Sequence, residues 1–400
     1  MANDVQGTSS EEKNFTDFAR TGPNTLAGQY LRKFWQPVYR SQDVPAGRAL
    51  PVRIMSEDFT LYRGKSNQPH LTEFRCPHRG TQLSAGWVED DCIRCLYHGW
   101  KFDQTGQCVE QPAEQESFAG KIRIRTYPTQ DYLGLIFAYL GEGEPPPFPH
   151  YPDWDKVGVN GVRYYIRKCN FFQYIENHCD PIHTPFVHRN RWVFGNDWKR
   201  ENLMTMTSEE MEWGLINRIT EPDGRTWITA MGLPNVHEKR QGNPHRVGIQ
   251  EEMGKLGSLN WNVPIDDETG IEFTIYAANS RRRWATDGGG KEEDMLALSA
   301  RAAELSEKVL AGKMTIEEAE TIAAKEKVFG TGAGANVGLM QDAVAQVGQA
   351  RIVDRRKDHL GRSDVAVILF RKLWSQELNA LAEGLPLHQW QRPEWLQANQ

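Results

Sequence analysis

The short run of residues 177–188 holds His183 and His188 together with one aspartate and one asparagine. Neutral imidazole is the most versatile nitrogen donor for iron, copper or zinc in proteins. On a regular helix, side chains five residues apart, such as His183 and His188, point in different directions. Pro185 lies between them and removes one helical hydrogen bond, so a bend or a bulge there would bring both rings to one point. The run is therefore a candidate metal site, or else the end of a helix that its asparagine and aspartate cap.

A second set of metal-binding residue types lies upstream, in two short loops that each hold one cysteine and one histidine. The first loop has the spacing Cys-x-His at Cys76 and His78, and the second has Cys-x-x-His at Cys95 and His98. These four residues could bind one tetrahedral zinc ion, and Cys92 adds a Cys-x-x-Cys step to that alternative. They could also bind a [2Fe-2S] cluster, with the cysteines on one iron and the histidines on the other. The loop spacing favours the cluster, because zinc sites on such loops use Cys-x-x-Cys steps.

The composition of the chain is typical of a globular protein with more than one domain. Its 400 residues exceed a comfortable single core, and 39% of them are hydrophobic against 25% charged. The formal net charge of −6 gives no electrostatic footprint for nucleic acid. The sequence holds no run of about 18 apolar residues, and its start has no signal-peptide pattern, so we expect no membrane partner and no secretion. We therefore expect a cytoplasmic protein whose six cysteines are thiols or metal ligands.

The two candidate sites fall into different parts of the chain. Residues 1–45 contain a polar tail and a helix expected over residues 25–35, and we expect this segment to pack on the second domain. From residue 46 onward, short alternating segments broken by glycine and proline indicate a small antiparallel β domain. The proline-rich residues 145–149 form a stiff connector that cannot continue a helix or a central strand. We therefore predict a β domain over residues 46–148 and a second domain over residues 149–400.

The second domain is expected to combine an antiparallel sheet with covering helices. Two strands should flank the turn Glu221-Pro222-Asp223-Gly224, in which proline and glycine provide the required backbone angles. Helices are expected over residues 291–311 and 316–327. The second of these helices should open with a capping box formed by Thr315 and Glu318.

With these motifs, the first half of the chain resembles the Rieske domain of ring-hydroxylating oxygenases. The resemblance rests on Cys76-Pro77-His78-Arg79-Gly80 and Cys95-Leu96-Tyr97-His98-Gly99-Trp100, and it extends over residues 51–141. It implies Cys76 and Cys95 as sulfur ligands, and His78 and His98 as nitrogen ligands, of a Rieske [2Fe-2S] cluster.

The run of residues 177–188 resembles the mononuclear iron motif of the same family, Asn/Asp-x-x-Asp-x-x-His-x-x-x-x-His. This chain matches the motif with Asn177, Asp180, His183 and His188. The resemblance implies an Fe(II) ion held by both histidines and one carboxylate, with open positions for oxygen and substrate. Asn177 is expected beside the iron, where it would affect access to the metal.

The sequence leaves three candidates for the carboxylate ligand, Asp342, Asp354 and Asp358. The pair Gln341-Asp342 resembles the Gln-Asp pair that supplies the ligand in the phthalate-dioxygenase-like branch of the family. We therefore predict Asp342, and the alternative is that it is an ordinary acid on a helix surface.

The resemblance also implies partner proteins. Family members pack head to tail in trimers, so Asp180 is expected to bond His98 of a neighbouring subunit and to make the electron path intermolecular. We expect a homotrimer or a hexamer. The glycine-rich segments 287–291 and 330–334 complete no phosphate or dinucleotide motif. Electrons are therefore expected from a separate flavin and iron–sulfur reductase that uses NAD(P)H, directly or through a ferredoxin.

The predicted fold class is α+β: an N-terminal all-β Rieske domain, then an antiparallel-sheet catalytic domain of the helix-grip type. The predicted protein is a terminal oxygenase that uses O2 to hydroxylate, dihydroxylate or oxidatively O-demethylate a small aromatic substrate, foremost an aromatic acid. Arg218 and Arg246 are candidate anchors for its carboxylate, since guanidinium forms a bidentate fork with that group. The alternatives are a Rieske electron-transfer protein without oxygenase activity and a zinc-bound interaction protein. The residues that could line the pocket, or else belong to the core, are Trp213, Asn217, Met231 and Trp261.

Overall fold

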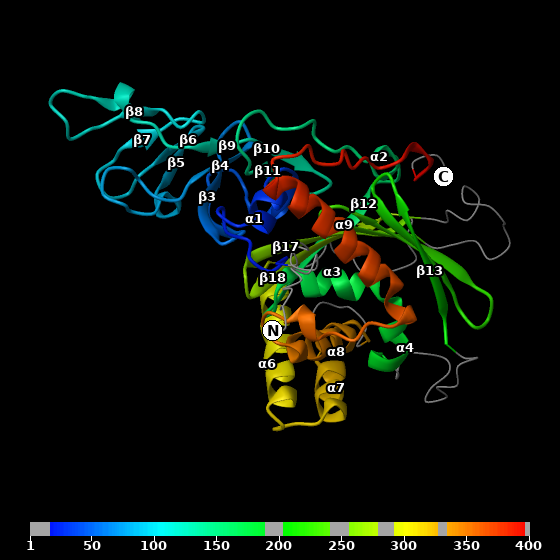
Figure 1. Cartoon of the computed structure of the whole chain (residues 1–400). Helices are drawn as coiled ribbons and strands as arrows, with labels where there is room; N and C mark the ends of the chain where they lie inside the picture. The colour runs from blue at the N-terminus through cyan, green and yellow to red at the C-terminus, as the bar shows by residue number, and fades with distance from the viewer. Residues whose placement is uncertain (1–16, 189–202, 241–255, 279–291, 327–333, 397–400) are drawn as a thin grey trace, which may run out of the picture.

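The computed structural model describes residues 17–188, 203–240, 256–278, 292–326 and 334–396. Figure 1 shows a smaller β-rich part built from the strands β1–β11 and a larger part that contains a long sheet and most of the helices. The strands of the smaller part are β1 (Trp35–Arg40), β2 (Ala49–Ile54), β3 (Glu57–Arg63), β4 (Pro69–Glu73), β5 (Trp87–Glu89), β6 (Cys92–Arg94), β7 (Lys101–Phe102), β8 (Cys108–Glu110), β9 (Thr126–Tyr127), β10 (Thr129–Tyr132) and β11 (Leu135–Tyr139). They form three antiparallel sheets with the strand orders β1-β11-β10, β2-β3-β4-β9 and β5-β6-β7-β8.

The larger part is built on one antiparallel sheet of seven strands. Its strands are β12 (Val159–Arg167), β13 (Thr205–Met211), β14 (Gly214–Thr220), β15 (Thr226–Gly232), β16 (Val236–Arg240), β17 (Leu256–Asp266) and β18 (Thr269–Ala277). Their order in the sheet is β12-β18-β17-β16-β15-β14-β13. Apart from β12, each strand lies beside its neighbour in the sequence, as expected of a meander.

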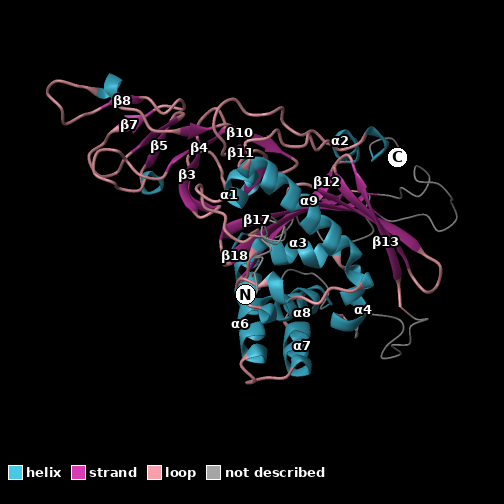
Figure 2. Cartoon of the chain, viewed as in Figure 1, coloured by secondary structure: helices cyan, strands magenta, loops and turns pink. Residues whose placement is uncertain are grey.

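Helices gather beside this sheet, as Figure 2 shows. They are α1 (Leu26–Leu31), α2 (Pro152–Val157), α3 (Phe171–Cys179), α4 (Thr184–Val187), α6 (Glu292–Leu310), α7 (Ile316–Lys325), α8 (Gly334–Gln349) and α9 (Val365–Ala382). Helices α6, α7 and α8 share a small core of their own, in which Met340 is fully buried. The fold is therefore α+β with an all-β N-terminal part, as predicted. None of the helices in the described part of the chain combines the length and the apolar character that a bilayer span requires.

The two faces of the seven-stranded sheet differ in chemistry. In β17, Trp261 points to one face and packs against Phe137 of the smaller part, with ring centroids 5.4 Å apart. Asn260 and Asn262 flank Trp261 and therefore point to the opposite face. Asn262 contacts His178 of α3, so this second face is the one that helix α3 covers. We call it the inner face, because it lies toward the candidate site described below.

Several local predictions are confirmed and one is wrong. Helix α7 opens with the predicted capping box, in which Thr315 and Glu318 each accept a hydrogen bond from the other's backbone amide. The strands β14 and β15 flank the predicted turn. The helix expected over residues 25–35 ends at Leu31, because the chain continues as β1, which pairs with β11. The backbone hydrogen bonds of this pairing come from a strand a hundred residues away, and local sequence does not reveal them.

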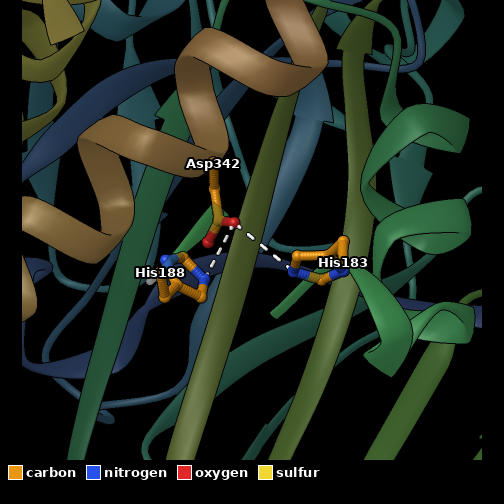
Figure 3. A group of neighbouring side chains, drawn as sticks. All are labelled: His183, His188 and Asp342. Carbon is orange, nitrogen blue, oxygen red and sulfur yellow. Dashed lines mark ion pairs between the residues drawn. The ribbon is translucent and has the colours of Figure 1, made fainter. Parts of the chain in front are cut away.

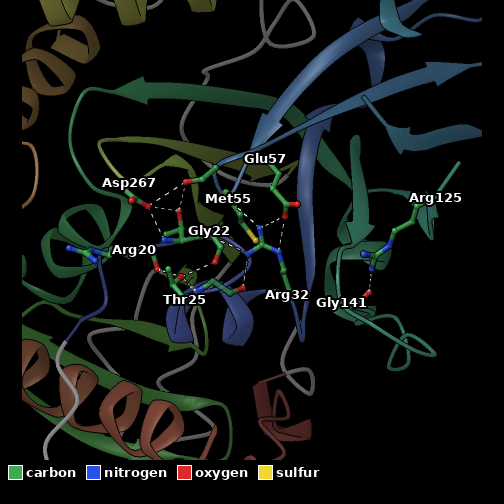
Figure 4. Close-up of polar contacts among 12 residues, drawn as sticks. Arg20, Gly22, Thr25, Arg32, Met55, Glu57, Arg125, Gly141 and Asp267 are labelled. Atoms are coloured by element: carbon green, nitrogen blue, oxygen red, sulfur yellow. Dashed lines mark hydrogen bonds and ion pairs between the residues drawn. The ribbon is translucent and has the colours of Figure 1, made fainter. Parts of the chain in front are cut away.

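A tight turn joins the smaller part to the seven-stranded sheet. Met55 and Ser56 link β2 to β3, and both adopt positive φ angles, 49° and 65°, as a type I′ hairpin turn requires. Their amides donate to the backbone oxygens of Pro264 and Ile265 at the end of β17, over 2.8 and 2.9 Å. Figure 4 shows Arg32 of the N-terminal segment at the same junction, where it donates to the carbonyl of Met55 over 2.9 Å.

Candidate metal centres

The two Cys/His loops have the same backbone hydrogen bonds. In each loop the glycine amide donates to the cysteine carbonyl, over 2.9 Å from Gly80 to Cys76 and 3.1 Å from Gly99 to Cys95. Both glycines have positive φ angles, 77° and 76°, which close the turn around the histidine. The arginine before each cysteine then donates to the glycine carbonyl, over 2.9 Å in the first loop and 2.7 Å in the second. The two loops therefore have the same conformation, and each presents one cysteine and one histidine.

The four side chains form two pairs. The Cys76 and Cys95 side chains lie against each other, while the rings of His78 and His98 have centroids 4.4 Å apart. Both cysteines are buried, and burial together with Cys95 raises the pKa of the Cys76 thiol to about 12. Two adjacent buried thiols become thiolates only when a cation compensates their charge. The atom Nδ1 of His78 is closed to solvent and has no hydrogen-bond partner among the described residues, which leaves it available to a metal.

This pairing distinguishes a two-iron cluster from a single zinc ion. The ligand atoms of one tetrahedral zinc lie less than about 4 Å from one another. Among the residues that the structure describes, the only group of three or more His, Cys, Asp or Glu ligand atoms within 4.8 Å of one another lies elsewhere in the chain. A cluster with the cysteines on one iron and the histidines on the other needs two separate pairs, as found here. The geometry of the loops thus fits a [2Fe-2S] cluster and gives the zinc alternative no support.

The group that does come together consists of His183, His188 and Asp342. The Oδ1 atom of Asp342 lies 3.7 Å from Nε2 of His183 and 3.3 Å from Nε2 of His188. Figure 3 shows the carboxylate reaching from α8 toward both imidazoles. The exposed fractions of the three side chains are between 14% and 19%, so the site is enclosed but reachable. Two imidazoles and one carboxylate that face a common point could hold a divalent metal.

The chain bends between α3 and α4, and this bend brings the histidines together. Helix α3 ends at Cys179, and the 3-10 helix η5 (Pro181–His183) leads directly into α4. Asp180 caps η5, since its Oδ1 accepts from the amide of Ile182 over 2.8 Å. The predicted distortion is therefore present, although it begins at Pro181 rather than at Pro185. It turns His183 and His188 toward Asp342, which a continuous helix would not do.

Each histidine is held through its other nitrogen. Nδ1 of His188 lies 2.8 Å from Oε1 of Gln341, and Nε2 of Gln341 donates to Oε1 of Glu320 on α7 over 2.6 Å. Nδ1 of His183 bonds the backbone oxygen of Asp180. Because an oxygen acceptor faces each Nδ1 atom, the proton of each neutral ring belongs on Nδ1. The Nε2 atoms, which face Asp342, are then unprotonated, as in histidines that bind a metal through Nε2.

The electrostatics of the site keep Asp342 ionised. Burial alone would raise its pKa, but the neighbouring His188, Arg167 and His183 lower the pKa to about 2. Arg167 lies 4.0 Å from the carboxylate and is itself buried. Asp342 therefore offers a charged oxygen at neutral pH, as a metal ligand must.

The other carboxylates proposed from the sequence lie elsewhere. Asp354 pairs with Arg356 over 2.7 Å and caps the 3-10 helix η8 (Arg355–Lys357). Asp358 pairs with Arg371 over 2.7 Å. Of the three candidates, the structure brings Asp342 alone to the two histidines.

The remaining residues singled out in the sequence are placed as follows. Nδ2 of Asn177 lies 3.2 Å from Nε2 of His183, so Asn177 stands beside the His/His/Asp group. Arg218 pairs with Glu209 over 3.1 Å, on the sheet face opposite to Asn217. Arg246 lies outside the described residues. Asn217 and Met231 belong to the inner face, whereas Trp213 and Trp261 pack against Tyr151 on the other side.

Sequence reasoning missed the residues that support the site from other elements. Glu320 and Arg167 carry no motif, and only the packing of α7, α8 and β12 brings them near Asp342. It also missed a polar group on the inner face around His178, His237 and Glu272. A signal for this group exists in the alternation Asn260-Trp261-Asn262-Val263, because every second residue of a strand shares one face.

Comparisons with known proteins agree with this geometry. Residues 34–128 match the family of Rieske [2Fe-2S] domains. The oxygenase subunit of 5,5'-dehydrodivanillate O-demethylase from Sphingobium sp. is 29% identical over 94% of this chain and 82% of its own length. Phenoxybenzoate dioxygenase subunit alpha from Ectopseudomonas oleovorans is 30% identical over 90% of this chain and 83% of its own length.

Solved structures share the fold. NdmA of Pseudomonas putida CBB5, as its QL mutant with caffeine, superposes with a TM-score of 0.62 at 18% identity over 89% of this chain and 93% of that chain. The oxygenase in the ferredoxin complex of carbazole 1,9a-dioxygenase gives a TM-score of 0.57 at 19% identity over 91% of this chain and 96% of that chain. At these identities the likeness concerns the fold.

Two β loops suited to a Rieske cluster and a separate His/His/Asp group define an iron-dependent oxygenase. The chain belongs to the Rieske oxygenase family, as an oxygenase subunit with a [2Fe-2S] cluster and a mononuclear iron. The alternative of an electron carrier without oxygenase activity is not supported.

Proposed function

We propose that this protein is the terminal component of a multicomponent oxygenase that hydroxylates, dihydroxylates or O-demethylates a small aromatic acid. The observation that carries the proposal is the convergence of His183, His188 and Asp342 on one point. Residues 46–148 would form the Rieske domain and residues 149–400 the catalytic domain, with residues 1–45 as an N-terminal segment.

The donor sets support specific ligand assignments. Cys76 and Cys95 would hold one iron of the cluster, and His78 and His98 the other, because each pair is already adjacent. The unpartnered Nδ1 of His78 is consistent with this role. When bound, the cluster supplies electrons and the mononuclear iron supplies oxygen activation.

The chain's own residues would prepare the mononuclear site. Gln341 and the carbonyl of Asp180 orient the two imidazoles, and Arg167 keeps Asp342 ionised. Two histidines and one carboxylate occupy one side of the metal, which leaves the opposite side for oxygen and substrate. Asn177 stands at the edge of this site, where its amide could influence access.

The relatives support an aromatic acid as substrate. The names of both curated relatives describe aromatic acids, one attacked at a methyl ether and the other dioxygenated. Arg246 remains a candidate for the carboxylate anchor. The geometry lends less support to Arg218, because Glu209 already engages its guanidinium.

Electron delivery would occur between subunits. Figure 1 shows the strands β5–β8, which carry the cluster loops, far from α4, which carries part of the mononuclear site. Within one chain Asp180 bonds the amide of Ile182 rather than His98. Next to His98, the side chains of Leu96 and Tyr97 are 43% and 52% exposed, so this corner can meet another subunit. We propose a head-to-tail trimer, alone or doubled into a hexamer, in which Asp180 bonds His98 of the neighbouring subunit.

Electrons would reach the cluster from an NAD(P)H-dependent reductase with flavin and iron–sulfur centres, either directly or through a ferredoxin. The ferredoxin complex of carbazole 1,9a-dioxygenase, a relative in fold, supports a protein donor of this kind.

The test combines metal analysis with product analysis. The wild-type protein should hold about three irons per chain, and the variant Asp342→Asn about two with an unchanged red-brown spectrum. With a generic reductase and isotopically labelled O2, the wild type should place label in the products of a panel of aromatic acids and aryl methyl ethers. Asp342→Asn should lose this activity at least about 100-fold, since its site lacks the charged ligand.

Two results would contradict the proposal. If the iron content is the same in Asp342→Asn and wild type, Asp342 does not hold the mononuclear iron. If no aromatic acid or aryl ether yields a labelled product, the substrate class is wrong. Glu317→Gln serves as the control, because Glu317 is an exposed acid on α7 outside the site.

A further inference from the structure

The inner face of the seven-stranded sheet is polar at positions that are buried. His237 of β16 lies opposite Asn260 of β17, and Asn262 follows two residues later. Their exposed fractions are 7%, 6% and 0%. Burial of an amide or an imidazole costs free energy unless its polar atoms find partners. The hydrogen-bond partners of these residues therefore indicate which of their polar atoms the protein uses and which remain for a ligand.

Glu272 of β18 organises the group. Its Oε1 accepts from Nδ2 of Asn260 over 2.9 Å and from the hydroxyl of Thr274 over 3.0 Å. Its Oε2 lies 3.5 Å from Nε2 of His178. A carboxylate oxygen only accepts, so the nitrogen of the Asn260 amide must face Glu272. The oxygen of that amide is thereby turned the other way.

His178 fixes the second amide in the same manner. Its Nδ1 lies 3.1 Å from Nδ2 of Asn262. Burial lowers the pKa of His178 to about 3, so the ring is neutral and carries one proton. The proton belongs on Nε2, which faces Glu272, and Nδ1 must therefore accept from the amide of Asn262. The oxygen of this amide is also turned away from its protein partners.

Four polar atoms remain without partners. They are Oδ1 of Asn260, Oδ1 of Asn262 and both ring nitrogens of His237, all closed to solvent and unpaired among the described residues. His237 stacks on His178, with ring centroids 4.4 Å apart, which holds the ring in place. Two acceptors beside a neutral imidazole, which donates through one nitrogen and accepts through the other, match a hydroxyl group that can do both.

The group adjoins both a cavity and the candidate iron site. A cavity of about 50 Å³ is lined by Glu272 and Thr274, which bond Asn260, and by residues of β12, α6 and α8. Asp342 and His183 both act on the pKa of His178, which places the group within electrostatic range of the metal ligands. His178 also follows Asn177, whose amide contacts His183.

We propose that His237, Asn260 and Asn262 form a subsite that recognises a neutral hydroxyl substituent of the substrate, held in register by Glu272 and His178. This inference rests on the proposed function and adds to it a second recognition point, separate from any carboxylate anchor. A carboxylate would be rejected here, because it would face two amide oxygens and lie near Glu272.

The test measures ligand binding to the holoenzyme without oxygen, so that catalysis plays no part. The probes are para- and meta-hydroxybenzoate, each compared with benzoate and with the corresponding methoxybenzoate by calorimetric titration. For the wild type, we expect at least one hydroxybenzoate to bind about tenfold or more tightly than benzoate. Benzoate has no hydroxyl group, so it would leave the buried polar atoms of the subsite without a hydrogen-bond partner.

The variants His237→Phe and Asn262→Leu should reduce this preference to about twofold or less while leaving benzoate affinity within about threefold. Phenylalanine keeps the stacking on His178, and leucine keeps the branched shape of the asparagine. The control Ser208→Ala, on the inner face of edge strand β13, should retain the preference. Iron content and the visible spectrum of each variant report whether the fold and both metal centres are intact.

Each other outcome has a definite meaning. Equal binding of hydroxybenzoates and benzoate to the wild type overturns the subsite but leaves the proposed function standing. A preference that survives in both variants shows that the unpaired atoms serve the fold through buried water, which also overturns the subsite. If no probe binds while labelled product forms from another aromatic compound, the subsite as proposed is wrong. If no probe binds and no aromatic compound is oxidised, the proposed function fails as well.

Discussion

At the scale of single residues, the orientation of His188 depends on a chain of three side chains. His188 bonds Gln341, which in turn donates to Glu320 on a different helix. The carboxylate fixes which way the Gln341 amide points, and the amide then fixes the tautomer of the imidazole. Such outer partners of metal-bound histidines commonly affect metal affinity about 10- to 100-fold.

We therefore expect Gln341→Met to weaken Fe(II) binding about 10- to 100-fold without loss of the [2Fe-2S] cluster. Methionine has a similar volume but offers His188 no oxygen acceptor. Competition with a ferrous chelator measures the affinity, and the visible spectrum reports the cluster. Gln349→Met is the matched control, because Gln349 is an exposed residue at the end of the same helix. Equal affinities in both variants would show that Gln341 does not support the site.

His178 provides a prediction about pH. Its pKa is lowered to about 3 by burial, whereas an unfolded histidine titrates near about 6.5. Between these values the unfolded chain binds a proton that the native chain does not, so stability falls as pH decreases below about 6.5. The contribution of this one group approaches about 1.4 kcal/mol per pH unit. Thermal unfolding of wild type and of His178→Gln at pH 7.5 and 5.5 measures this effect. Between these pH values the variant should lose less stability than the wild type.

The sequence was informative about residues only where a motif was local. His183 and His188 were found because they share one short run, and Asp342 because it follows Gln341. Glu320, Arg167 and His237 come from three other elements, and no spacing in the sequence records how those elements pack. Spacing alone left Asp342, Asp354 and Asp358 open, and the resemblance of the pair Gln341-Asp342 favoured the first of them.

At the scale of elements, the two cluster loops allow a matched comparison. Gly80 and Gly99 have the same positive φ, yet a Cβ atom at Gly80 would meet nothing within 4 Å, whereas one at Gly99 would lie 2.8 Å from Cγ of Pro112. Alanine at either position has a cost of about 1 kcal/mol for the left-handed backbone. At Gly99 a steric clash is added, so the second loop must shift.

We expect Gly99→Ala to reduce the [2Fe-2S] content of the purified protein clearly more than Gly80→Ala does. Iron and sulfide analysis, together with the midpoint of thermal bleaching of the cluster, provides the measurement. If the two variants bleach at the same temperature, the clash with Pro112 does not matter to the cluster.

Elements marked by their own residues were predictable, and those defined by distant pairing were not. The capping box of α7 and the turn between β14 and β15 are written in consecutive residues, so the sequence revealed both. The helix expected over residues 25–35 was too long, and strand β1 was not foreseen, because its identity depends on pairing with β11. The alternating strands around β17 signalled a sheet, but not that the polar residues of its inner face are buried.

At the scale of the whole molecule, the separation of the two metal centres is the reason for proposing that electrons pass between subunits. The strands β5–β8, beside the cluster loops, lie far from α4, which adjoins the mononuclear site (Figure 1). We expect Asp180→Asn to slow electron transfer from cluster to iron in single-turnover experiments, with both metals still bound. Asparagine can still accept from the amide of Ile182, so the local cap survives. Rates equal to wild type would contradict an intermolecular path through Asp180.

The turn at Met55 and Ser56 limits how freely the Rieske part could be exchanged between relatives. Its two amides are satisfied by Pro264 and Ile265, residues that a transplanted domain would leave behind. The side chain of Met55 is also fully buried at this junction, and Arg32 donates a hydrogen bond to the backbone carbonyl of Met55. In a chimera that exchanges the β-rich part alone, this turn would therefore meet a foreign β17 and lose its matched contacts. A chimera that folds would also have to include the β17–β18 hairpin and helix α1 of the same relative.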